Sequence, residues 1–394
     1  MKKVASWPEE FNLEPLDGWD ELSSIANAQG ETISADHFLS KGRLRVFCGT
    51  WNLHAKKPKD DLRLWIALNR YHIVAVGTEE CVHSIAKSVV FTSKKQWEDQ
   101  LKETLGNEYV LVAAHSLTAI HNVVFVHESL VPYLQNVQSD AVATGLGNQL
   151  GNKGGVGITF SIGNTSFAFV NCHFDAHQHN VSKRNANFHR INQELRLFPL
   201  KSMSPSSFQL NQVLGKTTSS RFSTSSSPIP TGDGQVEATA ARISSGSSSF
   251  CQKRPISEAF DRVFWYGDLN YRINGTRRMI DLLLLHNQHD VLRFNDQLQL
   301  EMQKGERIPS WTDRILYLSN EKPQDVELLS YRSHMNFQTS DHRPVGAVFQ
   351  VRFVGANIGE VKASTPGEDK DAFARVLARG YKSSQTRSEV CTVQ

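Results

Sequence analysis

The chain has 394 residues, of which 39% are hydrophobic and 21% are charged, and its formal net charge at pH 7 is +3. This composition is typical of a globular protein with room for one large α/β domain or two ordinary domains. The small net charge argues against the coating of nucleic acid and favours an acidic ligand held in a local basic pocket. The five scattered cysteines form no Cys-x-x-Cys pair, which argues against a disulfide framework and a zinc site and favours a reducing compartment. We expect neither a signal peptide nor a transmembrane helix.

Apolar periodicity predicts alternating strands and helices from residue 41 onward. Among residues 109–173, several strands follow one another with few helices between them, which indicates antiparallel pairing there. The predicted strands are 44–52, 72–76, 109–117, 120–128, 139–146, 155–162, 165–173, 264–267, 311–317, 325–332 and 343–354. The predicted helices are 19–28, 60–68, 94–105, 179–198, 277–286, 291–303 and 371–379.

The segment 201–254 differs from its surroundings because it is rich in Ser, Thr, Gly and Pro. Such a segment buries too little apolar surface to offset the entropy of ordering. Since the patterned sequence resumes on both sides, we predict a disordered insertion inside one catalytic domain over 41–354. Phosphorylation of this insertion is one possible role, but its composition favours no role at all. Residues 1–40 are then an N-terminal extension, and residues 355–394 a polar tail.

The stretch 264–272 holds the first candidate site residues, because Asp268 and Asn270 follow an apolar strand. Residues two apart on a strand point to the same side, so a continued strand directs both side chains into one space. The carboxylate can bind a metal or accept a proton, and the amide can donate to a phosphate oxygen. The alternative is a strand that runs into an Asx-rich turn without function.

Polar side chains also stand at the ends of other predicted strands. In layered α/β folds, ligands collect where strand ends and loops meet. One such residue alone is more often a turn or cap residue, but the whole set in an alternating β/α chain indicates a single site. The set comprises Asn52, Glu80, Asn171, His173, Asp268, Asn270, Asp341 and His342.

The residue types in this set favour a particular ligand chemistry. Carboxylate and amide oxygens without thiolates favour Mg²⁺, which keeps several waters and is shared with substrate phosphate. Lys153, followed by two glycines, fits an anion that approaches the backbone, although this signal is weak alone. Arg184 and Asn185 are expected to add phosphate contacts.

With these motifs in place, the sequence resembles the inositol polyphosphate 5-phosphatases, Mg²⁺-dependent enzymes of the fold shared with DNase I and the abasic-site endonucleases. The two most specific runs are Trp-x-Gly-Asp-Leu-Asn at 265–270 and Pro-Ser-Trp-x-Asp-Arg-Ile-Leu at 309–316. All the matching stretches occur in the order of the family: 49–52, 76–80, 152–156, 171–177, 184–185, 265–272, 307–316 and 340–345.

The resemblance implies a four-layer α/β sandwich of DNase I-like type, with mixed sheets flanked by helices. It implies removal of the 5-phosphate from phosphoinositides such as phosphatidylinositol 4,5-bisphosphate, or from soluble inositol polyphosphates. The implied metal site is Glu80 with Asn52, with Asp341 beside the metal.

The resemblance also implies catalytic and substrate-binding roles. Asp268, helped by Asn270, orients and deprotonates the attacking water. His342, oriented by Asp313, stabilises the developing charge on the scissile phosphate. The residues implied to bind phosphate or the rest of the substrate are Asn171, His173, Lys153, His177, Arg184, Asn185 and Arg272.

The sequence departs from the family pattern in three places. Glu79 stands where Gln is common, and Asp175 follows Phe174 where Leu-Ala is usual. The family segment with a Pro-Thr-Tyr-Lys motif, associated with the substrate's 4-phosphate, is missing near 303–307. We therefore expect reduced activity and stability.

Two rival functions remain open. A nuclease on the same fold needs a basic groove for a polymer, which the balanced charge disfavours, so we expect no nucleic acid partner. A non-catalytic module that binds a membrane or a partner is compatible with the missing segment.

The last four residues predict membrane attachment. Cys391, followed by Thr, Val and Gln, fits a farnesylation signal, and basic residues of the tail would attract anionic lipid. We therefore expect a cytoplasmic protein that associates peripherally with a membrane surface.

Overall fold

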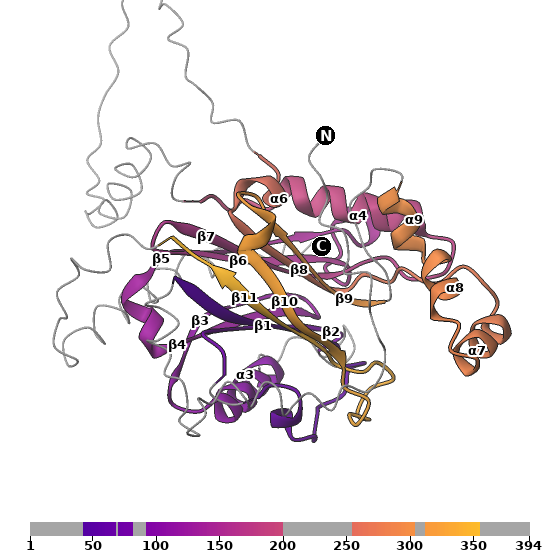
Figure 1. The fold of residues 1–394 in the computed structure, drawn as a ribbon, viewed down its shortest axis with the longest axis horizontal. Helices are drawn as coiled ribbons and strands as arrows, with labels where there is room; N and C mark the ends of the chain where they lie inside the picture. The colour runs from indigo at the N-terminus through magenta and orange to yellow at the C-terminus, as the bar shows by residue number, and fades with distance from the viewer. Residues whose placement is uncertain (1–41, 68–69, 82–91, 200–253, 304–311, 355–394) are drawn as a thin grey trace, which may run out of the picture. The chain divides into compact units, whose positions relative to one another are not determined.

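The computed structural model describes residues 42–67, 70–81, 92–199, 254–303 and 312–354. Two β-sheets lie face to face in this part of the chain (Figure 1). The first has the strand order β10-β11-β1-β2-β4-β3, and the second has the order β5-β6-β7-β8-β9.

The first sheet contains β1 (Arg43–Asn52), β2 (Ile73–Glu79), β3 (Tyr109–Leu117), β4 (Ile120–His127), β10 (Val326–Ser333) and β11 (Val345–Arg352). The second sheet contains β5 (Leu134–Ala143), β6 (Gly154–Ile162), β7 (Thr165–His173), β8 (Arg262–Asp268) and β9 (Asp313–Ser319). The antiparallel pairing expected for 109–173 is confirmed, because β3 pairs with β4, and β6 pairs with both β5 and β7, in that sense.

Each sheet contains one parallel pair of strands, and these two pairs determine where the polar strand ends meet. In the first sheet β1 runs parallel to β2, with Asn52 opposite Glu79. In the second sheet β7 runs parallel to β8, with His173 opposite Asp268. The carboxyl ends of two parallel strands lie at the same edge of a sheet, so each pair presents its polar end residues together.

The main core lies between the two sheets and consists of side chains that alternate along the strands. On β1, Val46 and Cys48 face this core, whereas Phe47 points to the opposite side of the sheet. Phe169 and Phe264 stack within the core, with their ring centroids 5.2 Å apart. This alternation follows from the period of two residues in a strand.

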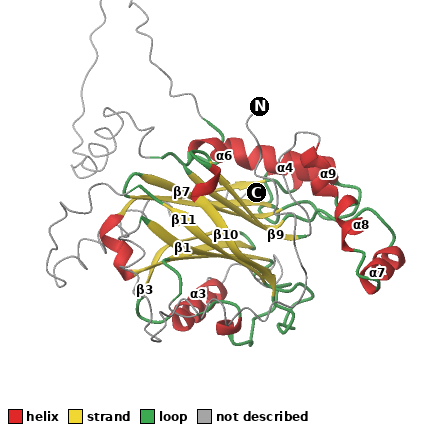
Figure 2. Cartoon of the chain, in the orientation of Figure 1, coloured by secondary structure: helices red, strands yellow, loops and turns green. Residues whose placement is uncertain are grey.

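Helices cover the outer faces of both sheets, as Figure 2 shows. Trp65, next to the 3₁₀ turn η1 (Leu62–Leu64), and Leu101 of α3 (Thr92–Leu105) pack on the first sheet. Ile191 of α4 (Val181–Glu194) and Ile256 of α6 (Ile256–Ala259) belong to the cluster on the second sheet. The predicted four-layer α/β sandwich is therefore confirmed.

Two of the predicted helices were wrong in extent. Over 60–68 the structure has only η1, whose cap residue Asp61 accepts a hydrogen bond from the Arg63 N–H. The helix predicted over 291–303 is interrupted by Asp296, which forms an isolated bridge with Ile273. The structure therefore has α7 (Arg277–Leu285), α8 (His289–Phe294) and α9 (Gln297–Gln303) in this region.

Most of the remaining helix and strand bounds agree with the sequence predictions to within two or three residues, but β5 begins five residues before its prediction, α4 ends four residues before its own, and α6 was not predicted. The further short 3₁₀ helices are Glu128–Tyr133, Leu146–Asn148 and Pro323–Asp325. Several predictions lie outside the described residues: the helices over 19–28 and 371–379, nearly all of the 201–254 insertion, the missing family segment, and Cys391. Among the described helices, none has the length and apolar character required to cross a membrane.

Candidate active site

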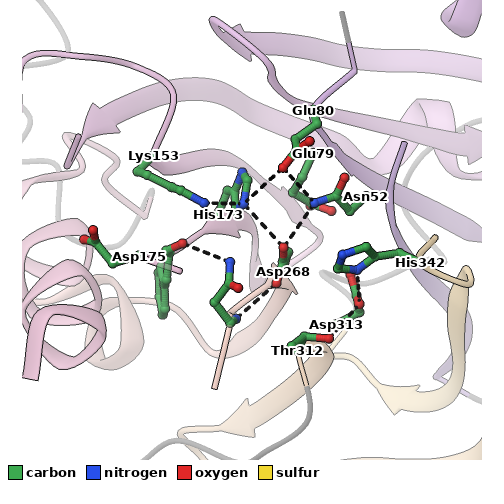
Figure 3. A network of polar contacts seen from close by, with 12 residues as sticks. Asn52, Glu79, Glu80, Lys153, His173, Asp175, Asp268, Thr312, Asp313 and His342 are labelled. Carbon is green, nitrogen blue, oxygen red and sulfur yellow. Dashed lines mark hydrogen bonds and ion pairs between the residues drawn. The ribbon is translucent and has the colours of Figure 1, made fainter. Parts of the chain in front are cut away.

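The polar ends of the two parallel strand pairs face each other across the gap between the sheets (Figure 3). Two contacts join them: Asn52 Nδ2 donates a hydrogen bond of 3.1 Å to Asp268 Oδ2, and His173 Nε2 lies 3.9 Å from Glu80 Oε1. Deeper between the sheets, Tyr266 Oη donates to Asn122 Oδ1 over 2.7 Å. The site therefore depends on the register of both sheets rather than on a single loop.

Gly267 explains how Asp268 reaches its position. Its φ angle is 133°, and a Cβ atom added there would lie 1.9 Å from the carbonyl oxygen of Cys172. Only glycine permits this approach of β8 to β7, because any other side chain begins with that Cβ atom. Gly267 thus sets Asp268 in register with His173 on the neighbouring strand.

Asp268 is a buried carboxylate surrounded by cationic or polar nitrogen atoms. His173 Nε2 lies 3.3 Å from Asp268 Oδ2 and 2.5 Å from Lys153 Nζ. Burial alone would raise the pKa of Asp268, but the hydrogen bond and charge of His173, with the charges of His342 and Lys153, lower it to about 2. Burial lowers the pKa of Lys153, and the charge of Asp268 opposes that change. Asp268 is therefore an anion at neutral pH and a weak base in the ground state.

Asp313 and His342 form a second charged pair beside Asp268. His342 Nδ1 lies 2.6 Å from Asp313 Oδ2, which also accepts a hydrogen bond of 3.1 Å from Thr312 Oγ1. Burial lowers the pKa of His342, but the hydrogen bond and charge of Asp313 outweigh it and raise the pKa to about 9. Burial and the charge of Asp268 raise the pKa of Asp313. At neutral pH the shared proton resides on the imidazole, and His342 presents a positive charge.

Two carboxylates at the mouth of the site provide oxygen ligands for a cation. The side chains of Glu80 and Asp341 are 41% and 64% exposed, and His54 Nδ1 lies 3.7 and 3.4 Å from them, respectively. Glu80 has a left-handed φ of 49°, which turns it out of the strand direction of β2. These anionic oxygen donors fit a hard divalent cation such as Mg²⁺.

Asn52 needs one change before it can act as a metal ligand. Its Oδ1 accepts a hydrogen bond from the His54 N–H over 3.0 Å, while its Nδ2 donates to Glu80 Oε1 over 3.3 Å. The amide nitrogen therefore faces the carboxylates, and an oxygen contact requires the amide to turn over. Deeper in the site, Asp268, Asp313 and His342 offer a second group of donors, with ligand atoms within 4.8 Å of one another.

Glu79 was not predicted as a site residue, yet it lies directly beneath the site. It is fully buried, and Thr50 Oγ1 donates to both of its carboxylate oxygens over 3.3 Å. Burial, followed by the charges of Asp313 and Asp268, raises its pKa well above the ordinary value. These surroundings favour the neutral form of Glu79, which is consistent with a carboxyl group where the resembling family commonly has Gln.

Three residues predicted to bind phosphate make contacts with other parts of the protein in this structure, and their phosphate-binding roles stay predictions. Asn171 is fully buried between the sheets, and its Nδ2 donates to the carbonyls of Thr78 and His121. Arg184 is also fully buried and donates to loop carbonyls and, over 2.7 Å, to Gln297 Oε1.

The third is Asn185, which donates to Glu301 and accepts a hydrogen bond from Tyr271 Oη. Together these polar groups hold the loops behind the site. Sequence position alone does not distinguish a side chain that points into a site from one that supports its back.

Asn270 reaches its place through a turn and not through strand alternation. Strand β8 ends at Asp268, and Asn270 has a left-handed φ of 56°. Its N–H donates to Asp268 Oδ1 over 3.1 Å, as in an Asx turn, and its Nδ2 donates to the Phe174 carbonyl. Asn270 therefore holds the Asp268 side chain in position through its N–H group. The prediction that strand alternation directs both side chains into one space was wrong, because the strand ends at Asp268.

Two further substrate-binding candidates lie at the periphery. Arg272 is exposed, and its Nη2 donates to Asn270 Oδ1 over 3.2 Å. It lines a pocket of about 370 Å³ together with Gln178, Arg277 and Thr312. His177 is exposed, and its backbone carbonyl accepts a hydrogen bond from Arg184, so the structure gives its ring no place in the central network.

The sequence also missed residues that the structure brings to the site. His54 and Thr312 stand next to motif residues, and each carries a polar group that contacts a site carboxylate. The available signal was their position, since Thr312 lies inside the matching stretch 307–316 and His54 lies two residues after the stretch 49–52.

Comparisons with known proteins were consistent with this arrangement. The model of a family described as "Endonuclease/Exonuclease/phosphatase family 2" matches residues 49–307 and 303–348. The fold and site thus define an α/β sandwich of DNase I-like type, and the chain belongs to endonuclease/exonuclease/phosphatase family 2. Its resemblance to the inositol polyphosphate 5-phosphatases is confirmed by the relatives it matches.

Among curated proteins, phosphatidylinositol polyphosphate 5-phosphatase type IV of Rattus norvegicus is 25% identical over 413 residues, which cover 93% of this chain and 56% of that protein. The Homo sapiens protein of the same name is 27% identical, over 82% of this chain and 49% of that protein. Synaptojanin of Caenorhabditis elegans is 26% identical, over 78% of this chain and 28% of that protein. The chain therefore spans about half the length of these relatives, or less.

Among solved structures, the inositol polyphosphate 5-phosphatase domain of a synaptojanin, in complex with inositol (1,4)-bisphosphate and calcium, has a TM-score of 0.59 and 22% identity. That match covers 89% of this chain and 95% of the other. A Cimex nitrophorin has a TM-score of 0.53 and 17% identity, with 79% of this chain and 99% of the other covered. At these identities both likenesses establish the fold alone.

Proposed function

We propose that the chain is a Mg²⁺-dependent phosphatase that removes the 5-phosphate from phosphoinositides or soluble inositol polyphosphates. The observation that supports this most strongly is the charged network around the buried carboxylate of Asp268. His173 contacts both Asp268 and Lys153. His342, paired with Asp313, adds a further positive charge that acts on Asp268. The names of the relatives, which are 5-phosphatases and synaptojanins, support the same substrate class.

Positive groups around the centre bind the phosphate. Lys153 Nζ and the His342 imidazolium flank Asp268 from different sheets, and each contributes to lowering its pKa. A phosphoryl group that enters between them meets a cation on either side. Because the groups are half-buried and already placed, they stabilise the developing charge without reorganisation during the reaction.

Asp268 orients the attacking water. Its pKa of about 2 means that it does not remove a proton from free water. It accepts the proton as the new bond between oxygen and phosphorus forms and the water becomes acidic. The bond from phosphorus to the inositol oxygen breaks, and that oxygen leaves with a proton, which His342 is placed to donate.

Glu80 and Asp341 are the residues that would hold the metal, with Asn52 after its amide turns over. A bound Mg²⁺ supplies positive charge that neutralises phosphoryl oxygens. The Asn52 hydrogen bonds to Glu80 and Asp268 keep the metal-binding and water-orienting carboxylates next to each other.

The pocket beside Asn270 receives the rest of the substrate. Arg272 and Arg277 line it, together with Gln178 and the backbone around Gly275. These two guanidinium groups suit the other phosphates of an inositol ring, because each guanidinium can donate two parallel hydrogen bonds to two oxygens of one phosphate.

The proposal is tested by phosphate release from inositol lipids and soluble inositol phosphates, with Mg²⁺ or with a chelator. We expect release with Mg²⁺ only. Asp268→Asn keeps the shape of the side chain but removes its charge, so turnover should fall about 100-fold or more.

Asp99→Asn, at an exposed position of α3, is the matched control and should behave as wild type. Near wild-type turnover in Asp268→Asn, with an unchanged circular dichroism spectrum, would contradict the role of Asp268. Phosphate release from no substrate would favour the non-catalytic alternative.

A further inference from the structure

Helix α7 is strongly apolar, yet none of its residues is buried. Its nine residues include four consecutive leucines, Leu282 to Leu285. Leu282 is 48% exposed and Leu285 is 73% exposed. A helix in a globular protein is usually held by burial of its apolar stripe, so within the described part of the chain α7 lacks the surface that normally covers such a stripe.

Three of the exposed apolar side chains of α7 lie on one side of the helix, whereas Leu284, which is 45% exposed, lies on another. Met279, Leu282 and Leu285 are spaced three residues apart and therefore neighbour one another along α7. Arg278 precedes Leu282 by four residues and lies on the same side.

The neighbouring helix carries further exposed apolar side chains. Helix α8 packs next to α7 and adds Val291 and Phe294, of which Phe294 is 69% exposed. We call this set the α7–α8 surface: Arg278, Met279, Leu282, Leu285, Val291 and Phe294.

The α7–α8 surface adjoins the pocket of the candidate active site. Arg277 and Ile280 of α7 form one wall of that pocket, and Thr312 forms another part of its lining. Thr312 also hydrogen-bonds Asp313, the partner of His342. Figure 1 shows α7 at the outer edge of the domain, with α8 leading back towards α9. A molecule bound in the pocket therefore has its outer end beside α7.

The charges of the surface favour an anionic partner. Arg277 pairs with Asp281 over 2.7 Å, and Arg293 lies 3.6 Å from Asp290. Among the described residues, Arg278 has no such carboxylate partner. The helices thus carry one net positive charge placed among exposed leucines. A purely apolar partner would leave the charge of Arg278 unpaired. A lipid layer offers phosphates to pair with Arg278 and acyl chains to cover the exposed leucines.

We propose that the α7–α8 surface docks on an anionic lipid bilayer. The apolar side chains reach the boundary of the acyl chains, and Arg278 pairs with a lipid phosphate. This inference rests on the proposed function, because it identifies the membrane-bound inositol phosphate as the substrate that enters the pocket. Docking brings the lipid headgroup to the pocket wall, so it aids hydrolysis at a membrane but not hydrolysis of a soluble inositol phosphate.

The test uses the full chain produced without lipid modification, and vesicles of phosphatidylcholine with or without phosphatidylserine. Leu282→Glu combined with Leu285→Glu places negative charge on the surface at two exposed positions. We expect wild type to sediment with the phosphatidylserine vesicles and the double variant to lose about tenfold or more of its vesicle affinity. Hydrolysis of soluble inositol 1,4,5-trisphosphate should stay within about twofold of wild type, because exposed substitutions rarely alter the fold.

Leu64→Glu is the matched control. Leu64 is a leucine of similar exposure, at 57%, in the 3₁₀ turn η1 beside the first sheet. It should bind vesicles as wild type does. The proposal is overturned if the double variant keeps wild-type vesicle affinity, or if wild type does not bind the vesicles. It is also overturned if wild type is a dimer that the double variant disrupts, since a second copy then covers the surface. Sedimentation requires no turnover, so a failure of phosphate release contradicts the proposed function alone.

Discussion

At the scale of single residues, the chemistry of the site depends on which of its buried carboxyl groups are favoured in the ionised form. Asp268 is held as an anion by His173, His342 and Lys153. For Glu79, beneath the site, burial and the charges of Asp313 and Asp268 raise the pKa. The surroundings thus shift the pKa values of these two carboxyl groups in opposite directions, which separates a water-orienting role from a supporting one.

The Asp313–His342 pair predicts a particular pH dependence. The pKa of His342 is raised to about 9, so the cation that binds phosphate is present below that pH and is lost above it. In Asp313→Asn, the hydrogen bond and charge that raise this pKa disappear, and burial then lowers it. The alkaline limb of kcat/KM against pH should therefore move down by about one unit or more. Asp99→Asn should leave the limb in place, and an unmoved limb in Asp313→Asn would rule out His342 as the titrating group.

The sequence located the site more accurately than it assigned the individual roles. Residues at the ends of the parallel pairs, such as Glu80, His173 and Asp268, were predicted because strand alternation and chain order place them at one edge. Asn171 and Arg184 share the same motifs, but their side chains point into the packing behind the site. That difference depends on the sheet-to-sheet contact, which a pattern in one chain segment does not contain.

At the scale of helices and strands, the apolar alternation sufficed to locate nearly all of the strands. It did less well for helices, since the Asp296 bridge with Ile273 divides a continuous apolar pattern into α8 and α9. The turn after β8 was predicted only as the alternative to a continued strand, and the structure has that turn, with Asn270 in the left-handed conformation and hydrogen-bonded to Asp268. The first difference is caused by a backbone bridge between residues distant in the sequence, and the second by a local hydrogen bond between a side chain and the backbone.

The close approach of β7 and β8 gives a prediction about stability. Gly267→Ala places a methyl group 1.9 Å from the Cys172 carbonyl, so the strands must separate. We expect a loss of about 3 kcal/mol or more in the free energy of unfolding, measured by denaturant titration.

Gly106→Ala is the control, because it measures how much of the lost stability comes from placing alanine at a positive φ angle. Gly106 also has a positive φ, of 85°, but nothing lies within 4 Å of the added methyl group. Its loss should be only about 1 kcal/mol. Equal losses in the two variants would show that strand contact is not the reason for glycine at position 267.

At the scale of the whole molecule, two sheets supply complementary halves of the site. The first contributes Asn52 and Glu80, and the second contributes His173, Asp268 and Asp313. We propose that the chain lacks the family segment expected near 303–307, and that this absence lowers the affinity for a 4-phosphate but leaves the centre intact. The support is that the charged network of the described residues is complete without the segment.

The measurement that tests the account most directly is the identity of the product formed from inositol 1,4,5-trisphosphate in the presence of Mg²⁺, determined by phosphorus NMR. The account predicts inositol 1,4-bisphosphate and free phosphate in equal amounts, and neither product when Mg²⁺ is removed by a chelator. Loss of the 1- or 4-phosphate instead, or unchanged hydrolysis in the chelator, would contradict it.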